Sequence, residues 1–255
     1  MLRWFSNSVV LSLSTLLAWR ERGVDALHRI DEAIMPLRCV FCGARRHPGE
    51  HRICRGCHRD LPWVRFACEQ CAAPVEFELP AGVHCASCQA HRSLLQMTVA
   101  PLRYEFPVDA GLKALKFGRR LHYAAAFAEL LIAQFPRFPP GIDALLPVPL
   151  HWRRQAFRGY NQAMELCMPL SKRLGLTMIT GVSRARPTIY QSGLSALERR
   201  RNLRNAFDVR APLKHRHVLV VDDVVTTGET TRQLASALFK GGAERVSVLA
   251  VARAV

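Results

Sequence analysis

The chain has 255 residues, of which 49% are apolar and 22% charged, and this composition excludes a largely disordered protein. Its 36 Lys and Arg residues against 20 Asp and Glu residues give a formal net charge of +16, which predicts anionic partners such as phosphorylated metabolites, nucleic acid or acidic lipid. The length suits one large α/β domain with a small appended module, and no apolar run reaches the ~18 residues of a stable membrane span.

Residues 1–35 form a leader whose role the sequence leaves open. The run from Val9 to Trp19 is apolar but short, and serines interrupt it. Leucines around it recur at helical spacing, so we expect an amphipathic helix or a loosely ordered leader. The alternatives are a secretion signal, although no small-residue cleavage site is clear, and a true start at Met35.

Eight cysteines follow in four C-x2-C pairs, within residues 36–92. A C-x2-C turn directs two thiolates at one point, and two such turns about a dozen residues apart complete a tetrahedral zinc site. The pattern predicts a double zinc ribbon with two structural zinc ions. Sequential pairing is the simplest arrangement and interleaved pairing the alternative; the eight expected ligands are Cys39, Cys42, Cys54, Cys57, Cys68, Cys71, Cys85 and Cys88.

The competing interpretation of these cysteines is four disulfides or redox motifs. Disulfides need an oxidising compartment, whereas no secretion signal is convincing, so we expect a cytoplasmic protein with reduced thiols. The module is too small for a large core, and metal binding should supply its folding energy. Arginines in the first half of the module suit nucleic-acid contact, or else form a solvated face: Arg45, Arg46, Arg52, Arg55 and Arg59.

Residues 93–255 alternate between strand-like and helical patterns. Helical patterns lie at about 122–135, 161–174 and 229–240. Such alternation predicts a mostly parallel sheet covered on both faces, which is an α/β fold. The expected strands are Thr98–Tyr104, Ile142–Val148, Leu176–Thr180, Val218–Asp222 and Val246–Val251.

Most of the positive charge lies in residues 151–216, which hold 14 basic and three acidic residues. Arginine dominates, and its planar guanidinium binds phosphate with two hydrogen bonds. A GC-rich coding bias explains the excess of Arg over Lys equally well, but it does not explain the clustering.

Near the C-terminus, an apolar β-branched run ends in Asp222 and Asp223, and a loop rich in Thr and Gly leads into a helix. Backbone N–H groups of residues 226–230 would surround a phosphate at the helix N-terminus, and Gly228 permits close approach. Two carboxylates beside a phosphate suit the vicinal hydroxyls of a ribose, directly or through Mg²⁺. The spacing fits neither a Walker A loop nor G-x-G-x-x-G. The plain alternative is a buried strand with a polar exit turn.

The segment VLVVDDVVTTGET, at residues 218–230, resembles the phosphoribosyl-pyrophosphate (PRPP) signature of type I phosphoribosyltransferases. With the doubled cysteine module before it, the chain closely resembles the ComF/GntX family of competence and DNA-uptake proteins. The resemblance covers residues 36–255 and includes LKALKFGRR, PVPLHWRRQAFRGYNQA and RARPTIYQSGLSALERRRNLRNAF. It implies a type I phosphoribosyltransferase-like domain over residues 93–255, which binds PRPP and Mg²⁺.

The resemblance also implies roles for individual residues. Asp222 and Asp223 would hold the ribose hydroxyls. The loop around the 5-phosphate would be Thr226, Thr227, Gly228, Glu229 and Thr230. The turn ending at Pro149 would be the pyrophosphate-side loop. Basic residues near the pyrophosphate or on a covering loop at 184–204 would be Arg153, Arg154, Arg158 and Arg200, with weaker support for Lys116, Arg119 and Arg120.

The sequence is compatible with two functions. Thr226 stands where purine phosphoribosyltransferases usually have Asp, which argues against purine salvage and leaves the acceptor unknown. The first hypothesis is a PRPP-dependent transferase that acts by positioning and charge stabilisation. The second is a non-catalytic, PRPP-responsive module that binds single-stranded DNA and works with competence proteins.

Overall fold

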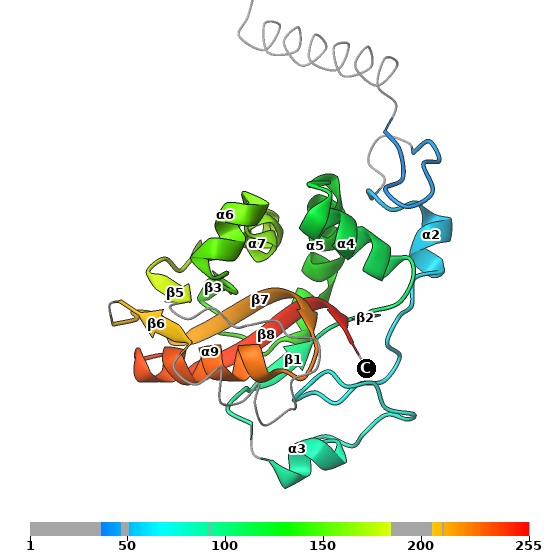
Figure 1. Ribbon diagram of the computed structural model, residues 1–255. Coiled ribbons are helices and arrows are strands. Elements are labelled where there is room, and N and C mark those ends of the chain that lie inside the picture. Colours follow the sequence, from blue (N-terminus) through cyan, green and yellow to red (C-terminus); the bar gives the residue numbers. More distant parts are fainter. Residues whose placement is uncertain (1–36, 47–50, 92, 185–205, 211, 255) are drawn as a thin grey trace, which may run out of the picture.

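The structure is a computed structural model that describes residues 37–46, 51–91, 93–184, 206–210 and 212–254 (Figure 1). The expected leader at 1–35, Arg200 and most of the expected covering loop lie outside the described residues. No helix in the described part of the chain is both long and apolar enough to cross a membrane.

A six-stranded sheet forms the centre of the molecule, and all its strand pairs are parallel. The order is β1-β8-β7-β3-β4, and β2 also pairs with β8. The two nine-residue strands, β7 and β8, lie side by side inside the sheet, where their apolar runs are buried on both faces. The strands are β1 (Met97–Val99), β2 (Leu102–Arg103), β3 (Ala144–Pro147), β4 (Thr177–Met178), β7 (His217–Val225) and β8 (Arg245–Arg253).

Helices cover both faces of this sheet, as Figure 1 shows. On one face, α4, α5 and α7 pack on Leu145, Leu219 and Leu249; on the other, α9 packs on Val218, Val220 and Val248. We call these the α5 face and the α9 face. The mostly parallel α/β fold is therefore confirmed. The helices of this part are α4 (Val108–Phe117), α5 (His122–Gln134), the 3-10 helix η1 (Phe135–Arg137), α6 (Trp152–Arg158), α7 (Gln162–Leu174) and α9 (Glu229–Lys240).

The expected strand Thr98–Tyr104 is wrong as a single element. It is divided into β1 and β2, which both pair with β8. Pro101 lies at the break, and proline has no backbone N–H to donate to a sheet. Pro101 instead accepts a hydrogen bond from the Val64 backbone N–H, at 2.8 Å.

Arg184 was expected in the covering loop but lies in a strand. It ends β5 (Val182–Arg184), which pairs antiparallel with β6 (Phe207–Val209) outside the main sheet. Arg184 faces Phe207 in this pair, with its guanidinium 5.4 Å from the ring centroid. The arginine is 9% exposed, so it is part of the packed structure at the edge of the fold.

The doubled cysteine unit is a structural repeat. Each half has a C-x2-C turn followed by a five-residue helix: α2 (Arg55–Arg59) in the first half and α3 (Ala86–Ala90) in the second. Each helix begins directly after a cysteine, Cys54 or Cys85, and these two cysteines have the same ψ of 159°.

The two halves of the repeat pack on opposite faces of the sheet. In the first half, Cys39, Ile53 and Leu61 join the core of the α5 face. Ala72 of the second half joins the core of the α9 face. Figure 1 accordingly shows α2 beside α4 and α5, and α3 far from α2, beyond β1.

Candidate functional site

The two acidic residues lie near the C-terminal end of β7. Val221 precedes the two acids and Val224 follows them, and both valines pack on the core of the α5 face. In a regular strand, residues three apart point to opposite faces of the sheet. The alternation therefore shifts at Asp222 and Asp223. Asp223 is buried at 8% exposure, and Asp222 is partly exposed.

Lys116 of α4 reaches the acid pair. Its Nζ lies 2.8 Å from Oδ2 of Asp223, and both side chains are mostly buried. Lys116 belongs to the LKALKFGRR segment, which the sequence supports only weakly as a ligand contact. The structure therefore adds a cation at the acid pair that balances one of its two negative charges.

The carboxyl of Asp222 is harder to ionise than an ordinary one. Burial, and then the neighbouring Asp223 carboxylate, raise the pKa of Asp222 to about 8. Hydrogen bonding from the Asp223 backbone N–H to Asp222 Oδ1, at 2.8 Å, and the positive charge of Lys116 act in the opposite direction. A carboxyl with a raised pKa of this kind is a candidate to bind a cation or hydroxyl groups.

The loop after β7 has the geometry expected for an anion site. Thr226 and Thr227 are exposed, and Gly228 has a φ of +73°, in the left-handed region that favours glycine. Helix α9 begins at the next residue, so its first-turn N–H groups, which lack partners within the helix, face the loop. Thr231 Oγ1 donates to the Gly228 carbonyl, at 2.9 Å, and fixes the turn.

Glu229 is oriented toward its own helix. It is 7% exposed; its carboxylate is paired with Arg232, and Oε1 accepts a hydrogen bond from Gln233 at 2.9 Å. Its backbone N–H is directed to Thr227 Oγ1, at 3.4 Å. The side chain therefore supports the helix start, and only the backbone of Glu229 remains suited to an anion.

The turn at Pro149 follows the neighbouring strand, β3, whose C-terminal end lies beside that of β7. The Val148 N–H donates to the Val221 carbonyl at 2.9 Å, immediately before the acid pair. Helix α6 begins after the turn, with His151 accepting a hydrogen bond from the Arg153 N–H at 3.3 Å. The structure thus brings α6 close to the end of β7.

The arginines of α6 surround this edge of the sheet. Burial lowers the pKa of Arg158, and the Asp223 carboxylate opposes that shift. Burial and then the positive charge of Arg154 lower the pKa of Arg184 to about 10, against the pull of Asp222. Arg158 therefore lies within electrostatic reach of Asp223, and Arg184 within reach of Asp222. Arg154 lies within electrostatic reach of both of these arginines. Arg153 is directed instead toward the Trp152 ring, 5.3 Å from its centroid.

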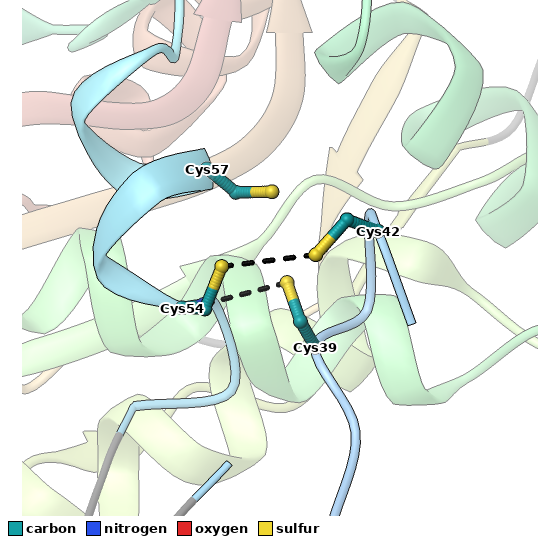
Figure 2. A group of neighbouring side chains, drawn as sticks. All are labelled: Cys39, Cys42, Cys54 and Cys57. Carbon is teal, nitrogen blue, oxygen red and sulfur yellow. Dashed lines mark hydrogen bonds between the residues drawn. The ribbon is translucent and has the colours of Figure 1, made fainter. Parts of the chain in front are cut away.

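The eight paired cysteines form two groups of four. The ligand atoms within each group all lie within 4.8 Å of one another. Figure 2 shows the thiols of the first group converging from the turn and from α2. The grouping is sequential: Cys39, Cys42, Cys54 and Cys57 in the first group, and Cys68, Cys71, Cys85 and Cys88 in the second.

The chemistry of these groups fits a dication. Although burial opposes it, hydrogen bonds from the backbone of Cys42 and Cys54 lower the pKa of Cys39 to about 6. Burial and the neighbouring thiols raise the pKa of Cys57. Four thiolates cannot be held together without a neutralising cation, and tetrahedral sulfur ligation suits structural Zn²⁺. All nine cysteines are free thiols, which contradicts the disulfide interpretation.

Several arginines of the first ribbon have structural contacts. Arg52 Nε lies 3.3 Å from Glu129 of α5, and the Arg52 backbone N–H donates to the same carboxylate at 2.8 Å. Arg46 donates to the Arg38 carbonyl at 3.2 Å. These two residues therefore fasten the ribbon and contribute less to a nucleic-acid surface than the sequence suggested.

Two contacts that the sequence did not predict depend on tertiary packing. Lys116 contacts Asp223 only because α4 packs across the α5 face. Arg253, at the end of β8, hydrogen-bonds to the carbonyls of Val225 and Cys71, each at 3.2 Å. Its position after an apolar strand, at the ligand-binding edge of a parallel sheet, was the one signal available.

Comparisons with known proteins agree with this architecture. Residues 30–89 match the family model of a double zinc ribbon domain. The chain is 36% identical over 226 residues to DNA utilization protein YhgH of Escherichia coli K12, covering 86% of this chain and 98% of that protein. It is 31% identical over 229 residues to competence protein F of Haemophilus influenzae, covering 85% and 97%.

A solved structure also shows a distant likeness. It is the glutamine PRPP amidotransferase from B. subtilis complexed with ADP and GMP, with 18% sequence identity and a TM-score of 0.37. The match covers 55% of this chain and 30% of that one.

Proposed function

The chain belongs to the ComF/GntX family of competence and DNA utilization proteins, and we propose that it binds PRPP together with Mg²⁺ at the end of β7 and acts in DNA uptake. The observation that carries this proposal is the succession of β7, its acid pair, a left-handed Gly228 and the start of α9. The names of the relatives, DNA utilization protein and competence protein, support the DNA-related role.

Each part of PRPP has a counterpart in the site. The loop amides of residues 226–230 would hold the 5-phosphate. Asp222 and Asp223 would accept hydrogen bonds from the ribose hydroxyls, and carboxylate oxygens are ligands that Mg²⁺ prefers. Lys116 would keep the Asp223 carboxylate in position. The turn at Pro149, with Arg154 and Arg158 of α6, would face the pyrophosphate, whose bidentate recognition suits Arg.

Whether the site also transfers the ribosyl group depends on an acceptor. In such a transfer, the bond from ribose C1 to the pyrophosphate oxygen breaks, pyrophosphate leaves, and an acceptor atom bonds to C1. The described residues near the acids are carboxylates and cations, which stabilise charge and position groups. Pyrophosphate release that depends on an added nucleobase would demonstrate the transferase, and its absence across all nucleobases would exclude that activity for them.

A calorimetric titration of PRPP with Mg²⁺ tests the binding proposal. We expect saturable binding to the wild-type protein and none to the Asp222→Ala/Asp223→Ala double variant, with the circular dichroism spectrum unchanged. The exposed Asp208→Ala on β6 is the matched control and should bind as the wild type does. Equal affinity of the double variant and the wild type would refute the site.

A second function, binding of single-stranded DNA, is favoured by one surface observation. Trp152 and Phe157 of α6 and Phe117 of α4 are 64%, 88% and 67% exposed. Arginines accompany them: Arg153 lies over Trp152, and Arg158 lies 5.0 Å from the Phe117 ring centroid. Exposed aromatic rings interleaved with Arg are the usual platform on which bases stack.

Removing the aromatic rings tests this second function. We expect Trp152→Ala/Phe157→Ala to weaken binding of a single-stranded oligonucleotide about tenfold or more, since base stacking contributes ~1–3 kcal/mol per base. Phe77→Ala, which removes an equally exposed ring from the second ribbon, should have no effect. Equal loss in both variants, or a flat dependence of affinity on salt, would contradict the proposed surface.

The proposal includes a cytoplasmic location. Reduced thiols in C-x2-C pairs, which would bind zinc, persist in a reducing compartment. All nine cysteines of the chain are free of disulfide bonds.

A further inference from the structure

Arg253, the last residue of β8, connects the second zinc ribbon to the loop after β7. Its Nε donates to the Cys71 carbonyl at 3.2 Å. Its Nη1 donates to the carbonyls of Val225, at 3.2 Å, and Thr226. One guanidinium therefore holds a cysteine of the second ribbon and the first residues of the loop at the same time.

The second ribbon is fixed to the sheet at the same place. The Thr98 N–H of β1 donates to the Glu69 carbonyl, and Thr98 Oγ1 donates to the Gln70 carbonyl, both at 2.8 Å. Glu69 and Gln70 lie between Cys68 and Cys71, so the backbone that carries two thiols is held to the sheet. A change in that turn is therefore transmitted to the Cys71 carbonyl that Arg253 contacts.

An open space separates the ribbon from the loop elsewhere. A cavity of about 390 Å³ is lined by Cys71 and Cys88 on the ribbon side and by Thr227 and Arg232 on the loop side. Because side chains of the described residues do not fill this space, the hydrogen bonds of Arg253 form a discrete connection that one substitution can remove.

The first ribbon is attached differently. It contacts α5 through Arg52 and Glu129, and Phe41 packs on Tyr123 and Phe127 with centroid distances of 5.8 and 6.2 Å. These contacts lie on the α5 face, whereas the loop leads into α9 on the other face. The two metal groups thus have unequal connections to the loop.

From this geometry we infer that Arg253 is a positioning residue through which the second four-cysteine site, and not the first, orders the anion-binding loop at residues 226–231. Metal at the second site would fix the Cys71 turn, and the guanidinium would then hold the Val225 and Thr226 carbonyls so that the loop N–H groups face the ligand. The inference rests on the proposed function for its ligand, but the ordering of the loop is measurable without any ligand.

The first test is hydrogen exchange of the loop amides in the full-length, ligand-free protein. We expect exchange of residues 226–231 to accelerate in Cys85→Ser/Cys88→Ser and in Arg253→Gln. The equivalent change at the first site, Cys54→Ser/Cys57→Ser, should leave that exchange within twofold of the wild type. If Cys85→Ser/Cys88→Ser does not fold, the exchange measured in Arg253→Gln is decisive by itself. Unchanged exchange of residues 226–231 in Arg253→Gln overturns the inference.

The second test is a double-mutant cycle on PRPP affinity. We expect Arg253→Gln to weaken PRPP binding about tenfold, the scale of a lost charge-assisted hydrogen bond, while metal analysis still finds the zinc content of the wild type. Combining Arg253→Gln with Cys85→Ser/Cys88→Ser should add little further loss, because both act through one connection. Additive losses overturn the inference. Absence of PRPP binding in the wild type refutes the proposed function but leaves the exchange test valid.

Discussion

Asp222 and Asp223 are consecutive carboxylates with different surroundings. Asp223 is paired with Lys116 at 2.8 Å, whereas Asp222 has no cation at that distance among the described residues. Burial and the nearby charge of Asp223 therefore disfavour ionisation of Asp222 and raise its pKa to about 8. Lys116 therefore balances the charge of Asp223, whereas Asp222 holds its proton more tightly than an ordinary carboxyl, and a bound cation would displace that proton.

This raised pKa predicts a pH-dependent stability. In the unfolded chain an Asp ionises near pH 4. Between about pH 4 and 8, Asp222 is therefore protonated more often in the folded state than in the unfolded state. The free energy of unfolding consequently falls as the pH rises through this range. We expect Asp222→Asn to remove this loss. The variant should match the wild type near pH 4 and become more stable than it toward pH 8, by up to about 1.4 kcal/mol per pH unit.

Urea denaturation of the ligand-free protein at several pH values measures this difference. For the control Asp208→Asn, at an exposed position, the free energy of unfolding should depend on pH as that of the wild type does. Parallel curves for Asp222→Asn as well would show that the Asp222 carboxyl is ionised as easily in the fold as in water.

The sequence predicted these acids, but it did not predict their partners. Asp222 and Asp223 follow an apolar strand and precede a Thr/Gly loop, which is a local pattern. Lys116 and Arg253 are distant in the chain and reach the site only through helix and strand packing. No local pattern encodes such contacts, so they required the structure.

The segment formed by β7, its loop and α9 is the element on which the candidate site depends. Gly228 stands between strand and helix with a φ of +73°, and its carbonyl accepts from Thr231 Oγ1. A Cβ at this position would meet only Thr231 Oγ1, at 3.9 Å. Space is therefore available, and the backbone angle alone selects glycine.

Substitutions at Gly228 should follow backbone preference rather than size. We expect Gly228→Val to destabilise the fold by about 1–2 kcal/mol, the cost of a left-handed conformation, and to weaken PRPP binding. Gly228→Asn should retain more of both, because Asn tolerates that region. Thermal denaturation and calorimetry measure the two effects, and equal loss for Val and Asn would point to steric contact instead.

Element prediction succeeded for three helices of 12 or 13 residues and failed for the ten-residue α4 and for several shorter elements. The expected helices at about 122–135, 161–174 and 229–240 agree with α5, α7 and α9 to within a residue or so. Helix α6 was not predicted, because its seven residues are mostly basic and aromatic and none is buried. The β5–β6 pair joins two three-residue strands across residues 185–206, a non-local pairing that period-two patterns do not reveal.

Along the sequence, the metal ligands and most of the excess positive charge fall in different segments. If eight thiolates bind two Zn²⁺, the net charge falls from +16 to about +12, and the ribbons become nearly neutral. The remaining excess belongs to residues 151–216, which include α6 and its exposed aromatic residues. Long-range attraction of a polyanion should therefore be directed to the α6 edge of the sheet rather than to the ribbons.

The packing of the ribbons makes zinc a determinant of the whole fold. Cys39, Ile53 and Leu61 belong to the core of the α5 face, and Ala72 belongs to that of the α9 face. We expect purified protein to contain about two zinc ions per chain. Removing them with a chelator should lower the denaturation temperature of the entire protein in one cooperative transition, because exposing these residues opens both cores.

Metal analysis and calorimetric melting with and without chelator measure this. Cys167→Ala, which alters a buried cysteine of α7 outside both groups, should keep the zinc content unchanged. A zinc content near zero with oxidised thiols would contradict the metal sites. If the sheet unfolds at the same temperature with and without chelator, the ribbons fold as a separate unit. The expected boundary of that unit lies between residues 92 and 93.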